Sequence, residues 1–220
     1  MTMTKVELLA AARLTLKDTA TPYLWDDTEL TGYIQDAEME AAFRADLLES
    51  DGVATYCTVA VVAGTATYTL NALVYEVKRA RIAGEGQHLI RTSRDKLDST
   101  STVWEDETGT PREYYLTGNS LRLVPNPTAN GSLNLVVHRL PVSPMGTSPE
   151  ISPLHHRRML DYAYKLAYLK RDADTYDPIK AMDFDRLFTE SFGIRRDARL
   201  QTRQLKHTAI EMKDTASEQW

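Results

Sequence analysis

Cysteine is almost absent from this chain of 220 residues, which contains only Cys57. A single cysteine excludes an internal disulfide. Cys57 lies in the run TYCTVAVV, whose threonine and valine content favours a β-strand. We therefore interpret it as a small buried thiol, and this composition is compatible with a reducing compartment.

Long apolar runs are also missing. No stretch approaches the roughly 18 residues that a membrane-spanning helix needs, so we expect no membrane partner. Lys5 and Glu7 stand where the apolar part of a secretory signal peptide would begin, and no small-residue cleavage site follows them. The sequence therefore predicts no signal peptide.

Motifs for catalysis are lacking as well. The chain contains none of the glycine-rich phosphate or dinucleotide loops and no G-x-S-x-G elbow. His155 and His156 are adjacent, so on a helix they would point about 100° apart and could not share one metal ion. We interpret them as surface residues of a first helical turn. Nothing distinguishes a catalytic pair among the 31 acids. We therefore predict no enzyme, no catalytic residue, no metal and no cofactor.

Charge is unevenly distributed along the chain, whose net charge is −5. Residues 25–51 contain nine acids against the single base Arg44, whereas residues 195–213 contain six bases against Asp197 and Glu211. Two segments of opposite charge suit a contact between neighbouring copies of the chain. The alternative is two solvated helix faces, which is the commoner reason for such runs.

Two helices are predicted before residue 53. The first covers Thr4–Lys17, with Thr4 and Glu7 as a capping box. Its predicted apolar face consists of Val6, Leu9, Ala10 and Leu14.

The second helix begins at Asp27 or Thr28 and is expected to run to about Ser50. One apolar face contains Leu30, Ile34, Ala37, Ala41 and Leu48, while Met39 and Phe43 point almost the opposite way. A surface helix usually needs one apolar stripe. The second stripe is therefore expected to lie under the chain's own β region or under another subunit.

Two more helices are predicted after residue 150. Ser152 is expected to cap the first of them, with Pro153 at its first position. Residues 159–169 are apolar on nearly every side, which indicates a central buried helix, and Asp161 and Lys165 could form an ion pair one turn apart. The last helix ends at Gly193. Residues 194–220 have few apolar anchors and are interpreted as an extending amphipathic helix or as a tail that a partner orders.

The middle of the chain, residues 54–141, has strand character. Glu113–Thr117, a turn at Gly118-Asn119 and Leu121–Val124 predict a hairpin, and Asn130-Gly131 predicts a further turn into an alternating strand. These strands together suggest a compact meander. Residues 94–107 are polar and are expected to be irregular.

The predicted fold class is α+β. Residues 1–53 and 150–193 form the core of an α-helical bundle, residues 54–141 form an inserted antiparallel β domain, and residues 194–220 form an extended C-terminal arm. No alternation of strands and helices favours a doubly wound sheet.

Three segments in order resemble the head–tail adaptor (connector) proteins of tailed double-stranded DNA phages. They are an acidic helix after a Trp-Asp-Asp opening, a Pro-then-Tyr strand followed by an L-R-L-x-P-x-P strand, and a final pair of helices. In this sequence they are Leu24–Arg44, Gly109–Val142 and Leu154–Gly193. Together they cover most of the chain.

The resemblance implies a structural protein of the virion neck, made in the host cytoplasm. Such proteins form a ring, commonly a dodecamer, that docks under the portal protein, receives tail or neck proteins on its opposite face, and lets genomic DNA pass without sequence-specific binding. By position, the basic C-terminal segment would contact the portal through Arg195, Arg196, Arg199, Arg203, Lys206 and Lys213.

Two further roles follow if the chain is a ring subunit, because cyclic contacts join two different flanks of the same protein. Met39 and Phe43 are then candidates for the subunit interface. The acidic side chains Asp36, Glu38 and Glu40 are candidates for lining the DNA channel, where they would repel phosphate.

Three alternatives stay open at this point. The chain could be another neck component such as a tail-completion or stopper protein, although those are usually richer in β structure. It could be a carbohydrate- or peptide-binding module that uses Trp104, Tyr114 and Tyr115, although core packing explains such aromatics more simply. It could also be a tail-associated hydrolase.

Overall fold

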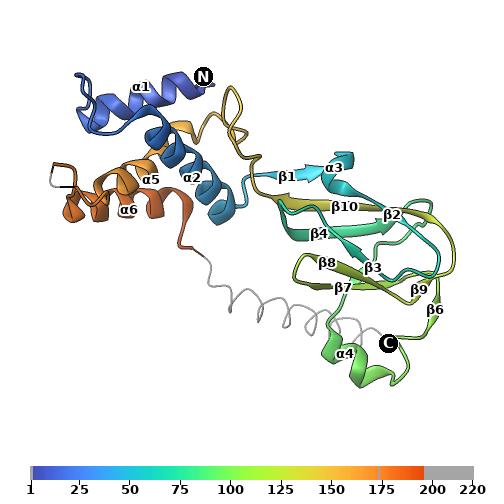
Figure 1. Cartoon of the computed structure of the whole chain (residues 1–220). Coiled ribbons are helices and arrows are strands. Elements are labelled where there is room, and N and C mark those ends of the chain that lie inside the picture. Colours follow the sequence, from blue (N-terminus) through green and yellow to red (C-terminus); the bar gives the residue numbers. More distant parts are fainter. Residues whose placement is uncertain (1, 173, 196–220) are drawn as a thin grey trace, which may run out of the picture. The chain divides into compact units, whose positions relative to one another are not determined.

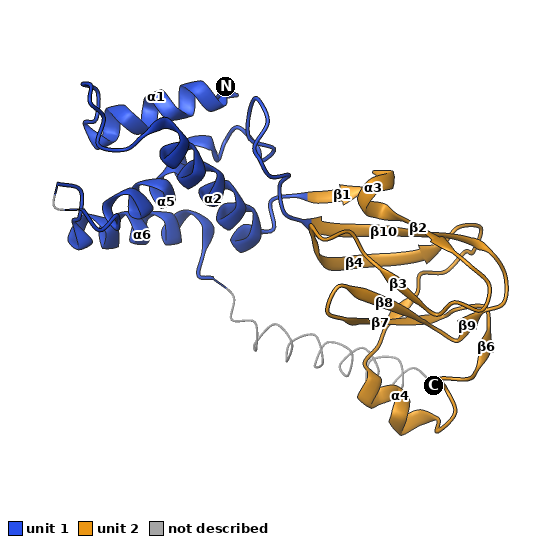
Figure 2. Cartoon of the chain, viewed as in Figure 1, with its two compact units in different colours: residues 1–48, 139–195 blue, residues 49–138, 196–220 orange. Residues whose placement is uncertain are grey.

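The computed structural model describes residues 2–172 and 174–195 (Figure 1). The chain divides into two compact units (Figure 2). The helical unit contains the described residues of 1–48 and 139–195, and the β unit contains residues 49–138. The N- and C-terminal helices pack together and the β-sheets come from the sequence between them, which confirms the predicted α+β class.

The helical unit is built around α5, His156–Tyr168. This helix contacts α1 (Lys5–Leu16), α2 (Asp27–Ala45) and α6 (Pro178–Phe192). Met159, Ala163 and Ala167 of α5 are fully buried in the shared core. The predicted central position of this helix is therefore confirmed.

Side-chain caps begin the first two helices where the sequence places them. Thr4 Oγ1 accepts a hydrogen bond from the Glu7 N–H, and the Glu7 carboxylate accepts one from the Thr4 N–H, which completes the predicted capping box. Asp26 caps α2 by accepting from the Glu29 N–H at 2.7 Å.

Most of the apolar face predicted for α1 lies away from the core, although Leu9 packs against it. Val6 and Leu14 are each 73% exposed, whereas Leu8, Ala12 and Leu16 are buried. Both sets follow a four-residue spacing, so the apolar pattern alone does not distinguish them. The buried face also includes Arg13, whose guanidinium is held by three partners, namely the carboxylates of Asp18 and Asp27 and the Trp25 carbonyl oxygen.

Helix α2 is shorter than predicted, since it ends at Ala45 and not near Ser50. Asp46 adopts a left-handed conformation, with φ of 51°, and its N–H donates to the Ala42 carbonyl. Aspartate tolerates this conformation better than most residues. Residues 49–51 then pair as strand β1 with β10, which competes with further helix.

Helix α5 begins three residues later than predicted, because residues 152–155 form a turn in which the His155 N–H donates to the Ser152 carbonyl. His156 is 1% exposed and not a surface residue: its Nδ1 accepts from the Met3 N–H, and its Nε2 lies 3.1 Å from the Ile151 carbonyl oxygen. Lys165 pairs with Asp185 of α6 at 2.8 Å and not with Asp161.

The β unit contains two main sheets. In the first, β10 (Gly131–Arg139) pairs with β1 (Glu49–Asp51), β2 (Thr58–Val61) and β4 (Val74–Ile82). In the second, the order is β3 (Thr67–Thr69), β8 (Ser120–Val124), β7 (Glu113–Thr117) and β5 (Ile90–Arg91). A short parallel pair joins β6 (Thr108–Gly109) to β9 (Asn126–Pro127).

The predicted meander is only partly right. The β7–β8 hairpin forms, with Gly118 at φ of 56° in its turn, and Leu133, Leu135 and Val137 of β10 are buried as the alternation predicts. Strand β10, however, joins the first sheet, because β8 already has β3 and β7 on its two edges. The two sheets contribute side chains to one core cluster. Two pairings are parallel, β5 with β7 and β6 with β9, which departs from the expected antiparallel domain.

The stretch predicted as irregular contains α4, Arg94–Thr100, capped by Ser93. Beneath it Trp104 packs edge-on against Tyr115 at 5.8 Å between ring centroids, in a small cluster with Leu97 and Val124. Trp104, Tyr114 and Tyr115 are buried, which confirms core packing for these aromatics.

Cys57 is also buried, at the end of the short helix α3 (Ala54–Cys57) and not within a strand. No helix in the described ranges has the length and apolar character to cross a membrane.

Candidate functional site

One face of α2 gathers most of the residues that the sequence singled out. Asp36, Met39, Glu40 and Phe43 recur at intervals of three and four, so they share a face of the helix. All four line one cavity of about 400 Å³ on the helical unit. Its other walls are Leu140, Tyr162 and Leu166 of α5, and Arg195. We call this cavity the α2 groove.

The predicted interface residues and two of the predicted channel residues thus lie in a single site. Met39 and Phe43 are half-buried and, with Leu140, give the groove an apolar floor. The opposite wall, Tyr162 and Leu166, escaped sequence reasoning. Both residues belong to a helix that is apolar almost all round, so the pattern gives no signal for which of them face outward.

Glu40 is held in a charge network and is not a free acid. Its carboxylate accepts from Arg44 Nε at 2.8 Å, and Arg195 Nε lies 3.6 Å from the same oxygen. Arg44 also donates to the Thr189 hydroxyl and to the Gly193 carbonyl, both at 3.2 Å. The network therefore ties α2 to the end of α6.

Arg195 is the first of the six predicted portal-contact bases and belongs to this site. Its guanidinium lies 5.9 Å from the centroid of the Phe43 ring, within the range of a cation–π interaction. The other five predicted bases, Arg196, Arg199, Arg203, Lys206 and Lys213, lie outside the described residues.

Asp36 is the exposed acid of the groove. Its carboxylate makes no hydrogen bond or ion pair with the residues that the structure describes. Partial burial raises the pKa of Asp36 above its ordinary value. Asp36 therefore presents an exposed carboxylate at the groove.

Glu38 lies on the opposite face of α2 and is 1% exposed. Its Oε1 accepts from the N–H groups of Glu150 and Ile151, at 2.6 and 3.4 Å. Burial raises the pKa of Glu38, and these two hydrogen bonds oppose that shift. The channel-lining prediction does not hold for Glu38, because a carboxylate buried in its own unit cannot face a channel.

Exposed apolar side chains collect on the helical unit. It carries eleven of the fifteen exposed large apolar side chains among the described residues. The most exposed are Val6 and Leu14 of α1, Leu154, Ile179 and Met182 of α6, and Ile194. Val6 and Leu14 belong to the apolar face that the sequence predicts for α1.

Comparison with known proteins gives one finding. Residues 3–209 match the family model described as SU10 adaptor protein. This match includes residues of both units. A search of curated proteins finds no match.

Proposed function

The chain belongs to the SU10 adaptor protein family, a family of phage head–tail adaptors, and from this membership we propose that it forms a ring that docks on the portal and connects the capsid to the tail. The observation that carries the proposal is the match over residues 3–209. The ring, commonly a dodecamer in proteins that this chain resembles, lies in the virion neck and encloses part of the DNA channel. The role is structural, and we assign no catalytic residue.

The α2 groove is the proposed contact between ring subunits. Its apolar floor, Met39 and Phe43, is only half covered within the helical unit. In a cyclic assembly each subunit presents two different surfaces to its neighbours. The exposed apolar side chains of the outer helices α1 and α6 are available as the complementary surface.

Asp36 is the proposed lumen residue of this face, because its carboxylate is exposed and has no partner among the described residues. An acid at the channel wall repels DNA phosphate, so DNA slides past it. Glu40 is buried and paired with Arg44, so in this proposal its carboxylate does not face the channel.

The basic C-terminal segment is the proposed contact with the portal. Arg195 stands at the groove, and Arg196, Arg199, Arg203, Lys206 and Lys213 follow it in the sequence. Positive charge concentrated in this way suits an acidic protein surface.

The test uses portal-containing heads and the full-length protein. A truncation after Arg195 retains the groove contacts but removes five of the six bases. We expect it to stay folded by circular dichroism and to be missing from heads purified by sedimentation. A full-length Arg199→Glu/Arg203→Glu variant is expected to lose most of its binding as well.

The control for this experiment reverses two charges elsewhere. Lys78→Glu/Arg79→Glu changes two exposed bases on β4 of the β unit and is expected to bind heads normally. Heads that retain the truncated protein at the level of the full chain would contradict portal contact by this segment. Electron microscopy of necks would then locate the ring directly.

A further inference from the structure

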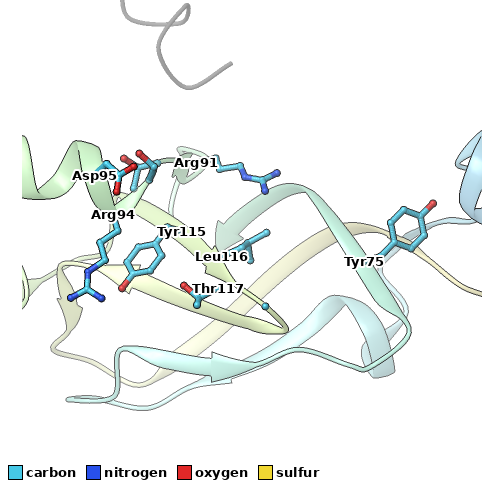
Figure 3. Close-up of a pocket in the computed structure, with 10 residues that line it drawn as sticks. Tyr75, Arg91, Arg94, Asp95, Tyr115, Leu116 and Thr117 are labelled. Atoms are coloured by element: carbon cyan, nitrogen blue, oxygen red, sulfur yellow. The ribbon is translucent and has the colours of Figure 1, made fainter. Parts of the chain in front are cut away.

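A second cavity, of about 400 Å³, lies within the β unit (Figure 3). It is lined by the end of β5 and the start of α4, by the β7–β8 turn, and by Tyr75 of β4. The side chains around it include Arg91, Arg94 and Asp95 together with Tyr115, Leu116 and Thr117 (Figure 3). None of these residues has a part in the α2 groove.

Thr92 is the first sign that this cavity takes a ligand. Its backbone N–H donates to the Tyr114 carbonyl at 2.8 Å, which fixes the residue beside β7. Thr92 is only 6% exposed, and its hydroxyl has no hydrogen-bond partner in the part of the chain that the structure describes. A buried hydroxyl without a partner costs free energy, so a group that enters the cavity and accepts a hydrogen bond from this hydroxyl would be stabilised.

Arg91 is the second sign. Its side chain is half-buried, yet it forms no hydrogen bond or ion pair with any residue in 2–172 or 174–195. Arg94 adds a second guanidinium to the wall, with Glu105 as its exposed partner at 3.0 Å. A guanidinium presents parallel N–H donors that match the two oxygens of a carboxylate.

The charge of the cavity selects among oxyanions. Asp95 also lines the wall and Arg94 is paired with Glu105, so the cavity has no large excess of positive charge. A singly charged carboxylate meets less repulsion from Asp95 than a phosphate close to two negative charges. The remaining walls, Tyr75, Tyr115 and Leu116, suit the aliphatic stem of an acidic side chain.

We propose that this cavity binds an acidic peptide, with a Glu or Asp carboxylate accepting hydrogen bonds from Arg91 and from the Thr92 hydroxyl. The partner is a protein segment rather than a free ion, because the volume exceeds that of one carboxylate and the walls contain apolar surface. This site gives the β unit a recognition role of its own, beyond the ring contacts of the helical unit.

The experiment measures binding by calorimetry with the full-length protein. The probe is acetyl-Glu-Glu-Glu-amide, and acetyl-Gln-Gln-Gln-amide and inorganic phosphate are the comparison ligands. We expect the glutamate peptide to bind, the glutamine peptide not to bind, and phosphate to bind more weakly. Arg91→Ala should weaken peptide binding about 10-fold or more, as expected for the loss of a charged hydrogen bond. The control Arg79→Ala, an exposed arginine of the other sheet, should bind the peptide normally.

Thr92→Val separates a ligand role from a structural role, because valine keeps the shape and removes the hydroxyl. We expect weaker peptide binding with no loss of thermal stability, since the hydroxyl has no partner to lose. Three outcomes would each overturn the proposal. They are a lower melting temperature of Thr92→Val, equal peptide binding by Arg91→Ala and the unchanged protein, and binding of phosphate or of the glutamine peptide that is tighter than binding of the glutamate peptide. All of these measurements use purified protein without heads, so their failure leaves the adaptor role unaffected.

Discussion

At the scale of single residues, the helical unit contains buried charged groups that join one helix to another segment of the chain. Glu38 joins α2 to the segment before α5 through the N–H groups of Glu150 and Ile151. Arg13 joins α1 to the loop before α2 through Asp18, Asp27 and the Trp25 carbonyl. A buried group of this kind is costly to disrupt, because a buried partner loses its hydrogen bond when the group is removed.

Glu38→Ala is therefore expected to lower the free energy of unfolding by about 1–3 kcal/mol, since two backbone N–H groups lose their acceptor. Urea denaturation followed by circular dichroism measures this loss. The matched control is Asp36→Ala, two positions away on the same helix but exposed, for which a change within about 0.5 kcal/mol is expected. Equal losses in both variants would contradict the structural role of Glu38.

The loss of stability in Glu38→Ala is also expected to depend on pH. Burial raises the pKa of Glu38 above its ordinary value of 4.5, so the folded state holds this proton more tightly than the unfolded state does. The contribution of Glu38 to stability is therefore fully present below pH 4.5 and declines as the pH rises through the folded-state pKa. The difference between the unchanged protein and Glu38→Ala should be larger in acid than at neutral pH.

At the scale of elements, α2 carries the surface that we propose as the subunit contact. The helix has two apolar faces. Leu30, Ile34 and Ala37 of one face are fully buried against the other helices. Met39 and Phe43 of the other face line the α2 groove. The second apolar stripe is thus partly covered by α5 of the same unit, and part of it stays exposed.

Phe43→Asp is expected to reduce incorporation into heads about 10-fold or more, because assembly would bury an unpaired charge in the groove. Quantitative blotting of purified heads measures incorporation, and circular dichroism checks that the variant is folded. The control is Val103→Asp, which places the same charge at an exposed apolar position of the β unit. Normal incorporation of Phe43→Asp would exclude the groove as the subunit contact.

At the scale of the whole molecule, the chain consists of two units with separate cores. The β unit enters and leaves at neighbouring points, because Glu49 of β1 lies opposite His138 of β10. Its core is complete within residues 49–138 and includes Leu121, Leu133 and Leu135. A unit with its own core and adjacent ends can fold without the rest of the chain.

The isolated fragment 49–138 is therefore expected to fold, with dispersed amide resonances in an NMR spectrum and one cooperative unfolding transition. A Leu133→Asp version of the fragment is the control and should be unfolded, since Leu133 is fully buried in the core. A spectrum typical of an unfolded chain for the unchanged fragment would show that its stability depends on the helical unit.

The sequence by itself determined the fold class, the helix cap at Thr4, the β7–β8 hairpin and the family resemblance. These features depend on residues close together in the chain or on the order of segments, so the linear sequence is sufficient to predict them. Only the tertiary structure decided which stripe of α1 is buried, that Glu38 is a structural acid, that β10 joins the first sheet, and that Arg91 and Thr92 share a cavity. Each of these depends on a partner from elsewhere in the chain, and periodicity specifies the faces of an element without specifying what covers them.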